Sequence, residues 1–150
     1  MNRELLHLDK VETVLDYGCG QSRLVDWLAR MNDATATRFD PAVPEHATPP
    51  TGRFDAVIDT DILEHIPEED VDDFLRKIRS LTDNAYFNVS VREAIEILPN
   101  GGNVHCTVKE SKWWGQKIAN TFGLARRASS NDVTSLAWVT WKKIARTALF

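Results

Sequence analysis

Strands and helices alternate along this 150-residue sequence, and this alternation predicts an α/β fold with a mostly parallel sheet. Short apolar runs typical of buried strands recur at residues 13–17, 35–39, 54–59 and 85–89. Between them lie segments with the apolar spacing of helices, at 22–31 and 67–79, and a further one follows at 107–122. Residues 125–129 and 133–141 read as a final hairpin across 130–132, so the sheet should carry an antiparallel strand near its end.

The composition is that of one ordinary globular domain, and we expect residues 1–150 to form it. The formal net charge is −4, so the chain has no excess of positive charge that would bind a phosphate backbone. A nucleic-acid partner is therefore not expected. The two cysteines, Cys19 and Cys106, have no spacing that suggests zinc and cannot make a disulfide framework. No metal site is expected.

The N-terminal residues lack the apolar run of a signal peptide. No stretch approaches the length needed to cross a bilayer. These two observations favour a cytoplasmic protein without a membrane partner, and they leave its oligomeric state open.

The most informative segment is Asp16-Tyr17-Gly18-Cys19-Gly20, in which a strand runs into a glycine turn that opens a helix. Glycines let a ligand approach the backbone, and the start of a helix offers N–H groups to it. Ser22 is a candidate N-cap for this helix. Asp40 lies 22 residues beyond Gly18, at the end of the next strand, where a carboxylate can accept hydrogen bonds from two ribose hydroxyls.

Two classes of cofactor suit a glycine turn followed by a spaced acid. A dinucleotide requires G-x-G-x-x-G, and here Arg23 occupies the third glycine position, which disfavours a nicotinamide oxidoreductase. The other class is S-adenosylmethionine.

The segment from Asp16 to Gly20 resembles the first motif of class I S-adenosylmethionine-dependent methyltransferases. Phe39-Asp40-Pro41 resembles their second, acidic motif. Residues 54–58, followed by 61–66, resemble their fourth strand and the segment after it. The similarity covers residues 11–90. Residues 98–105 also resemble a pattern found in short, uncharacterised methyltransferase-like proteins of bacteria and phages.

This resemblance implies S-adenosylmethionine as the cofactor. Asp16, Gly18 and Gly20 would lie near its methionine half, and Asp40 would hold the ribose. The full set of implied cofactor-binding residues is Asp16, Tyr17, Gly18, Cys19, Gly20, Ser22, Asp40, Pro41, Thr60, Asp61 and Ile62.

The chain departs from the family pattern between Asp40 and Phe54, where the family usually has a helix and a further strand. Only residues 41–53 are available here, and four of them are prolines. A helix alone averages about 11 residues. We therefore expect a trimmed Rossmann-like methyltransferase fold that lacks the usual third strand and has residues 35–39 at the sheet edge.

Methyl transfer to an oxygen acceptor needs alignment of the reactants and a base for the proton. His65 and His105 are the candidate catalytic bases, because imidazole titrates near neutral pH. Asn103 and Trp113 are candidate acceptor-binding residues in a segment, 98–114, that could cover the cofactor. The alternative for His105 is a capping role beside a possible Thr107–Glu110 capping box. The alternative for Trp113 is packing in the core.

The leading interpretation is a methyltransferase that acts on a small molecule or a peptide. Nucleobase methyltransferases typically carry an Asp/Asn-Pro-Pro-aromatic tetrad after the fourth strand, and this chain has Asp59-Thr60-Asp61-Ile62 there. This difference disfavours methylation of a nucleobase and leaves methylation at another position of a nucleic acid open. The alternative from another class is a non-catalytic S-adenosylmethionine-binding module, a sensor or a subunit.

Overall fold

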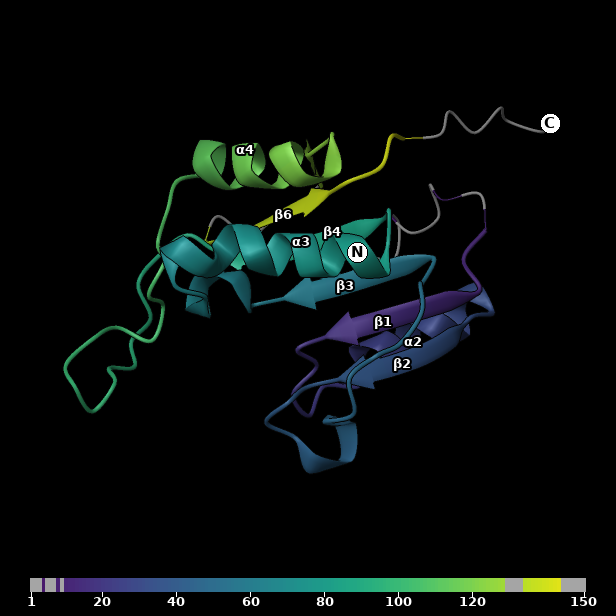
Figure 1. Ribbon diagram of the computed structural model, residues 1–150, viewed down its shortest axis with the longest axis horizontal. Coiled ribbons are helices and arrows are strands. Elements are labelled where there is room, and N and C mark those ends of the chain that lie inside the picture. Colours follow the sequence, from purple (N-terminus) through teal and green to yellow (C-terminus); the bar gives the residue numbers. More distant parts are fainter. Residues whose placement is uncertain (1–3, 5–7, 9, 129–133, 144–150) are drawn as a thin grey trace.

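The computed structural model describes residues 4, 8, 10–128 and 134–143. Over these residues the chain forms one sheet with strands in the order β2-β1-β3-β4-β6-β5 and helices on both of its faces (Figure 1). The strands are β1 (Thr13–Tyr17), β2 (Thr35–Phe39), β3 (Ala56–Thr60), β4 (Ala85–Ser90), β5 (Arg126–Arg127) and β6 (Ser135–Val139). The α-helices are α2 (Leu24–Asn32), α3 (Val71–Leu81) and α4 (Ser111–Phe122).

The predicted sheet is confirmed in type and direction. Strands β2, β1, β3 and β4 pair in parallel, and β6 runs antiparallel to both β4 and β5. The third strand begins at Ala56 rather than Phe54, because the Phe54 amide donates to the Leu81 carbonyl instead of joining the sheet. The predicted turn at 130–132 lies outside the described residues.

Helices α3 and α4 cover one face of the sheet and α2 covers the other (Figure 1). On the first face Trp114 and Ile118 of α4 pack with Leu75 and Ile78 of α3. On the second face Val25 and Leu28 of α2 pack against β1 and β3. The side chains of both layers come from alternate positions of the same strands, as a sheet buried on both faces requires.

The residues that α2 buries differ from those that the apolar spacing in the sequence predicts. Trp27 and Met31 continue the i, i+3, i+4, i+7 pattern, yet they are 46% and 56% exposed. The buried positions are Val25, Leu28 and Ala29. The helix is therefore rotated so that Val25 and Ala29 face the sheet, and the two larger side chains lie on its outer flank.

The expected trimming of the fold is confirmed. Residues 41–53 contain one short 3-10 turn, Pro44–His46, and no strand. Proline lacks the amide that a strand or helix interior needs, and four prolines in this stretch leave it as a loop. Strand β2 is consequently an edge strand of the described sheet.

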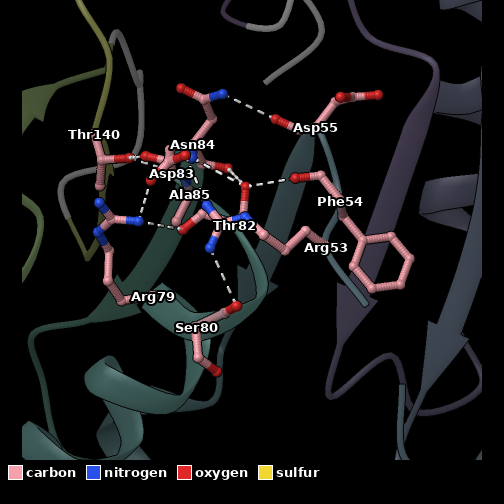
Figure 2. Close-up of polar contacts among 10 residues, drawn as sticks. All are labelled: Arg53, Phe54, Asp55, Arg79, Ser80, Thr82, Asp83, Asn84, Ala85 and Thr140. Carbon is pink, nitrogen blue, oxygen red and sulfur yellow. Dashed lines mark hydrogen bonds and ion pairs between the residues drawn. The ribbon is translucent and has the colours of Figure 1, made fainter. Parts of the chain in front are cut away.

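A polar network closes the amino-terminal edge of β3 and β4 (Figure 2). The Thr82 hydroxyl donates to the Phe54 carbonyl at 2.9 Å and accepts from the Asn84 amide at 3.0 Å. Thr140, just after β6, accepts from the Ala85 amide at 2.8 Å. These buried hydroxyls satisfy backbone groups at the start of the strands, and they leave the opposite, carboxyl-terminal edge for the functional site.

None of the helices in the described parts of the chain combines the length and the apolar character that a membrane span requires.

The network predicts that Thr82→Val destabilises the protein although it conserves the side-chain volume. The Thr82 side chain is fully buried, so valine leaves the Asn84 amide without this acceptor, at a cost of about 1–3 kcal/mol. Urea unfolding measures the change. The control is Thr51→Val, an exposed loop position, which should change stability by less than about 0.5 kcal/mol. Equal stability of the two variants would contradict the role given to the network.

Candidate functional site

The glycine turn after β1 is held against the end of β2 by three amide groups. The Gly18 and Cys19 amides both donate to the Phe39 carbonyl, at 2.7 and 3.1 Å. The Gly20 amide donates to Oδ2 of Asp40 at 2.8 Å. The other oxygen of Asp40 accepts from the Ala42 amide at 2.8 Å. The turn and the acid that the sequence places 22 residues apart therefore form one unit.

Gly18 also makes room for the loop that follows β3. Its φ of +84° lies in the left-handed region. A Cβ at this position would lie 2.5 Å from Cδ1 and 2.6 Å from Cγ1 of Ile62. A side chain at Gly18 would displace Ile62, so the glycine is required by the close approach as well as by the turn.

A cavity of about 600 Å³ lies at this edge of the sheet. Its lining residues come from the ends of β1, β2, β3 and β4 and from the start of α2: they are Gly18, Cys19, Gly20, Ser22, Leu24, Asp40, Thr60, Asp61, Ile62 and Asn88. Most of the expected cofactor-binding residues are thus brought together here. Asp16, Tyr17 and Pro41 are not among the lining residues, and sequence reasoning missed Leu24 and Asn88. The position of Asn88, a polar residue in the apolar run of β4, was the available signal for it.

The start of α2 faces the same cavity. Ser22 accepts a hydrogen bond from the Leu24 amide at 3.1 Å, so its hydroxyl serves the first residue of the helix. The residue in the N-cap position is Arg23, which makes no side-chain capping bond. The expected capping by Ser22 therefore occurs one residue earlier than in a standard cap.

Asp16, the last-but-one residue of β1, is only 1% exposed. Its Oδ1 has no hydrogen-bond partner in the described part of the chain. Burial raises the pKa of Asp16 to about 7, although the nearby Arg38 opposes the shift. A carboxyl group that changes charge near neutral pH therefore lies beneath the glycine turn.

Asp61 connects this cavity with a second one. Asp61 adopts a φ of +59°. Its backbone amide donates to the Asn88 carbonyl of β4 at 2.9 Å, and its Oδ1 accepts from Nδ2 of Asn88 at 3.0 Å. The second cavity measures about 250 Å³. Its lining residues are Asp61, Glu64, Ser90, Arg92, Glu93, Ala94, Ile95, Glu96, His105 and Ser135.

The two predicted catalytic histidines lie side by side, with ring centres 4.9 Å apart. Of the two, His105 lines the second cavity. Nδ1 of His65 lies 2.9 Å from the Val104 carbonyl, and Nδ1 of His105 lies 2.7 Å from the Arg92 carbonyl. A carbonyl oxygen can only accept, so Nδ1 carries a proton in each ring, and in the neutral form of the ring the lone pair is on Nε2. The structure thus brings together two histidines that are 40 residues apart in the sequence.

Glu64 joins this pair from the same 3-10 turn as His65, Leu63–His65. Its side chain is fully buried, and Oε1 accepts from the Ser90 amide at 2.9 Å. Oε2 has no partner in the described residues. Burial raises the pKa of Glu64. The sequence favoured a solvated or supporting acid at this position, so Glu64 was not among the candidate site residues; its position directly before His65 was the signal.

Asn103 fixes the loop that carries His105. Its Oδ1 accepts from the amides of Ala94 and His105, at 3.0 and 2.9 Å, and its side-chain amide donates to the Ala94 carbonyl at 2.8 Å. The side chain therefore positions His105.

The proposed capping box at Thr107 is wrong. The Thr107 hydroxyl donates to the Ile66 carbonyl at 2.7 Å, because the residue is buried beside the 63–65 turn, and α4 starts at Ser111 with Glu110 as N-cap. Trp113 packs against the core and lies near the ammonium groups of Lys109 and Lys117. It lines neither cavity, so an acceptor-binding role for it stays a prediction. Within the 98–114 segment, only His105 lines either cavity.

Comparison with known proteins identifies the family. The chain matches the model of a methyltransferase domain over residues 1–140. It therefore belongs to this family of methyltransferase domains, and its fold is the Rossmann-like fold of such enzymes. No curated protein matches the chain in sequence.

Solved methyltransferase structures share the fold at low sequence identity. The methyltransferase domain of bacterial CtHen1 is 18% identical, with 91% of this chain and 93% of that chain covered and a TM-score of 0.65. The 1,6-didemethyltoxoflavin-N1-methyltransferase of Burkholderia thailandensis is 19% identical, with 92% and 74% covered and a TM-score of 0.64. The mitomycin 7-O-methyltransferase MmcR is 12% identical with a TM-score of 0.67; the match covers 86% of this chain but only 48% of MmcR, so the chain spans about half of that protein's length.

The close approach at Gly18 predicts that Gly18→Ala destabilises the protein more than Gly52→Ala does. Both glycines have nearly the same φ, +84° and +83°, but a Cβ on Gly52 meets no atom within 4 Å. Gly52→Ala is therefore the control, and it should lose only the cost of placing alanine in the left-handed region, about 1–2 kcal/mol of stability. Gly18→Ala should add about 1–3 kcal/mol of overpacking against Ile62, measured by urea unfolding. The explanation fails if the two variants lose the same stability.

The raised pKa of Asp16 predicts a pH-dependent stability. Between about pH 4, the value of an unfolded aspartate, and pH 7, the native state holds the proton more tightly than the unfolded state. The contribution of Asp16 to the free energy of unfolding is therefore fully present below this window, falls as the pH rises through it, and is lost above pH 7. Asp16→Asn cannot ionise, so its stability relative to the wild type should increase from pH 5 to pH 8, by up to about 3 kcal/mol, because about two pH units of the window lie above pH 5. Thermal or urea unfolding at both pH values measures this difference. The exposed Asp33→Asn should show no such trend, and a flat profile for Asp16→Asn would show that Asp16 is ionised throughout.

Proposed function

We propose that this protein binds S-adenosylmethionine in the cavity of about 600 Å³ and transfers its methyl group to a small-molecule or peptide acceptor. The observation that carries the proposal is the bonding of the glycine turn to Asp40 at the wall of this cavity. In open α/β sheets, ligands bind at the carboxyl ends of the strands, which is where this cavity lies. The family of the chain supports the same reaction.

The residues at the cavity fit this cofactor. Each oxygen of Asp40 accepts one amide hydrogen bond, which leaves further lone pairs for the two ribose hydroxyls. Asp16 lies outside the lining of the cavity, directly before it in β1, and its unpaired Oδ1 suits the ammonium group of the methionine half; a nearby cation would favour the ionised form of this carboxyl. Gly20 leaves open space where a side chain would otherwise stand. Ile62 offers an apolar surface.

The second cavity is the proposed acceptor site, because Asp61 lines both cavities and so places them next to each other. When bound, the cofactor supplies a methyl group already activated by its sulfonium, so the protein's task is to align the acceptor and accept a proton. The free Nε2 of His65 or of His105 can take that proton. Asn103 supports this role indirectly by fixing the position of His105.

The proposal predicts that the protein binds S-adenosylmethionine and S-adenosylhomocysteine and that Asp40→Ala weakens this binding. Loss of hydrogen bonds to a charged group costs about 1.5–3 kcal/mol, which corresponds to roughly tenfold or more in the dissociation constant. Calorimetry measures both ligands and NAD. The control is Glu45→Ala, which removes an exposed carboxylate from the same loop and should leave the affinity unchanged.

Binding of NAD in place of S-adenosylmethionine would contradict the proposal, and an unchanged affinity in Asp40→Ala would contradict the ribose assignment. Turnover separates an enzyme from a binding module. Formation of S-adenosylhomocysteine in the presence of fractionated metabolites supports methyl transfer, whereas tight binding without product supports a sensor or subunit.

A further inference from the structure

Glu64, His65 and His105 bring three metal-ligand atoms within 4.8 Å of one another. Two of these residues come from the turn after β3, and the third comes from the loop before α4. Imidazole nitrogen with carboxylate oxygen is a donor set that suits divalent transition metals such as Mn²⁺, Fe²⁺, Co²⁺ and Zn²⁺. The arrangement is separate from the cavity proposed for the cofactor, although Asp61 borders both.

The orientation of the two rings is the first argument for a metal site. Nδ1 of His65 and Nδ1 of His105 each donate to a backbone carbonyl, at 2.9 and 2.7 Å. Metal-binding histidines use this outer hydrogen bond to fix the tautomer and present the other nitrogen to the ion. Asn103, which accepts from the His105 amide, holds the second histidine in place.

The second argument is the buried oxygen of Glu64. The side chain is fully buried, yet Oε2 has no hydrogen-bond partner in the described part of the chain. A buried polar atom without a partner is costly, and a cation beside it removes that cost. The unpaired oxygen belongs to the residue whose ligand atom lies within reach of both imidazoles.

We propose that Glu64, His65 and His105 bind one divalent transition-metal ion. Two ligands that each lie about 2.1 Å from an ion are at most about 4.2 Å apart, so a pair at the 4.8 Å limit has to close by at least about 0.6 Å on binding. Three protein ligands leave coordination positions open, as in catalytic rather than structural metal sites.

Two of the three ligands, Glu64 and His105, also line the cavity proposed for the acceptor. An acceptor in that cavity can therefore reach the ion, and this part of the inference rests on the proposed function. If the ion takes part in the reaction, the acceptor is a compound with a hydroxyl oxygen that can coordinate it. Coordination lowers the pKa of that hydroxyl, and its proton passes to solvent water. The oxygen then forms the bond to the methyl carbon as the carbon–sulfur bond breaks, and S-adenosylhomocysteine leaves as a neutral sulfide. His65 and His105 act as ligands in this form of the reaction, and the ion replaces a protein base.

Metal binding is tested on the 150-residue chain without a tag, after treatment with a chelator. Titration with Co²⁺, followed by calorimetry and visible absorption, should show one ion per chain and a spectrum with nitrogen and oxygen ligation. His65→Ala and His105→Ala should each weaken Co²⁺ binding by about tenfold or more, since even the loss of an outer-shell partner costs that much. The matched control is His46→Ala, which removes a histidine from the 41–53 loop and should bind Co²⁺ as the wild type does.

Melting temperatures separate a lost ligand from a lost fold. Without metal, the histidine variants should melt close to the wild type; Co²⁺ should raise the melting temperature of the wild type and of His46→Ala alone. Glu64→Gln, which keeps an acceptor for the Ser90 amide, should also lose the Co²⁺ effect. Absence of Co²⁺ and Mn²⁺ binding at millimolar concentration, or wild-type binding by both histidine variants, overturns the inference.

The test is independent of the cofactor. Binding of S-adenosylmethionine without binding of Co²⁺ overturns the metal site and leaves the proposed function standing. Binding of Co²⁺ at this site without S-adenosylmethionine supports the metal site and overturns the proposed function.

Discussion

The candidate site depends on the hydrogen bonds that join the ends of β1 and β2. The Phe39 carbonyl accepts from two amides of the glycine turn, and the Asp40 carboxylate accepts from a third, Gly20. These bonds keep the turn open toward the carboxyl edge of the sheet rather than folded over it. The close approach of Ile62 to Gly18 then defines the opposite wall of the cavity. Thr60 and Asn88, which also line this cavity, lie on β3 and β4, and these strands continue the parallel sheet from β1.

The same bonds explain how the fold tolerates its missing strand. Residues 41–53 are too short and too rich in proline for a helix and a strand, so β2 stays at the edge of the described sheet. Asp40 nevertheless has a fixed position, because its amide donates to the His46 carbonyl at 3.0 Å and the 3-10 turn Pro44–His46 folds the loop back beside it. The acid that the proposal assigns to the ribose is thus held by local contacts and needs no further strand.

The sequence predicted what short-range chemistry determines and missed what tertiary contacts determine. The strands, the glycine turn and the loop at 41–53 follow from apolar runs, glycine and proline, all of which act locally. The burial of Ala29 in place of Met31 depends on how α2 meets the sheet, and Thr107 bonds to Ile66 rather than capping α4. The contact of His65 with His105 joins residues that are 40 positions apart, and no spacing rule within one segment could predict it.

The central claim is that the cavity at the carboxyl edge holds S-adenosylmethionine through the turn at Gly18–Gly20 and through Asp40. A crystal structure with S-adenosylhomocysteine tests this claim most directly. The account predicts the ribose hydroxyls within hydrogen-bond distance of the Asp40 carboxylate, the methionine half beside the glycine turn, and the sulfur directed toward Asp61 and the cavity that contains His105. A ligand bound at any other place on the molecule, or in this cavity with its ribose away from Asp40, would contradict it.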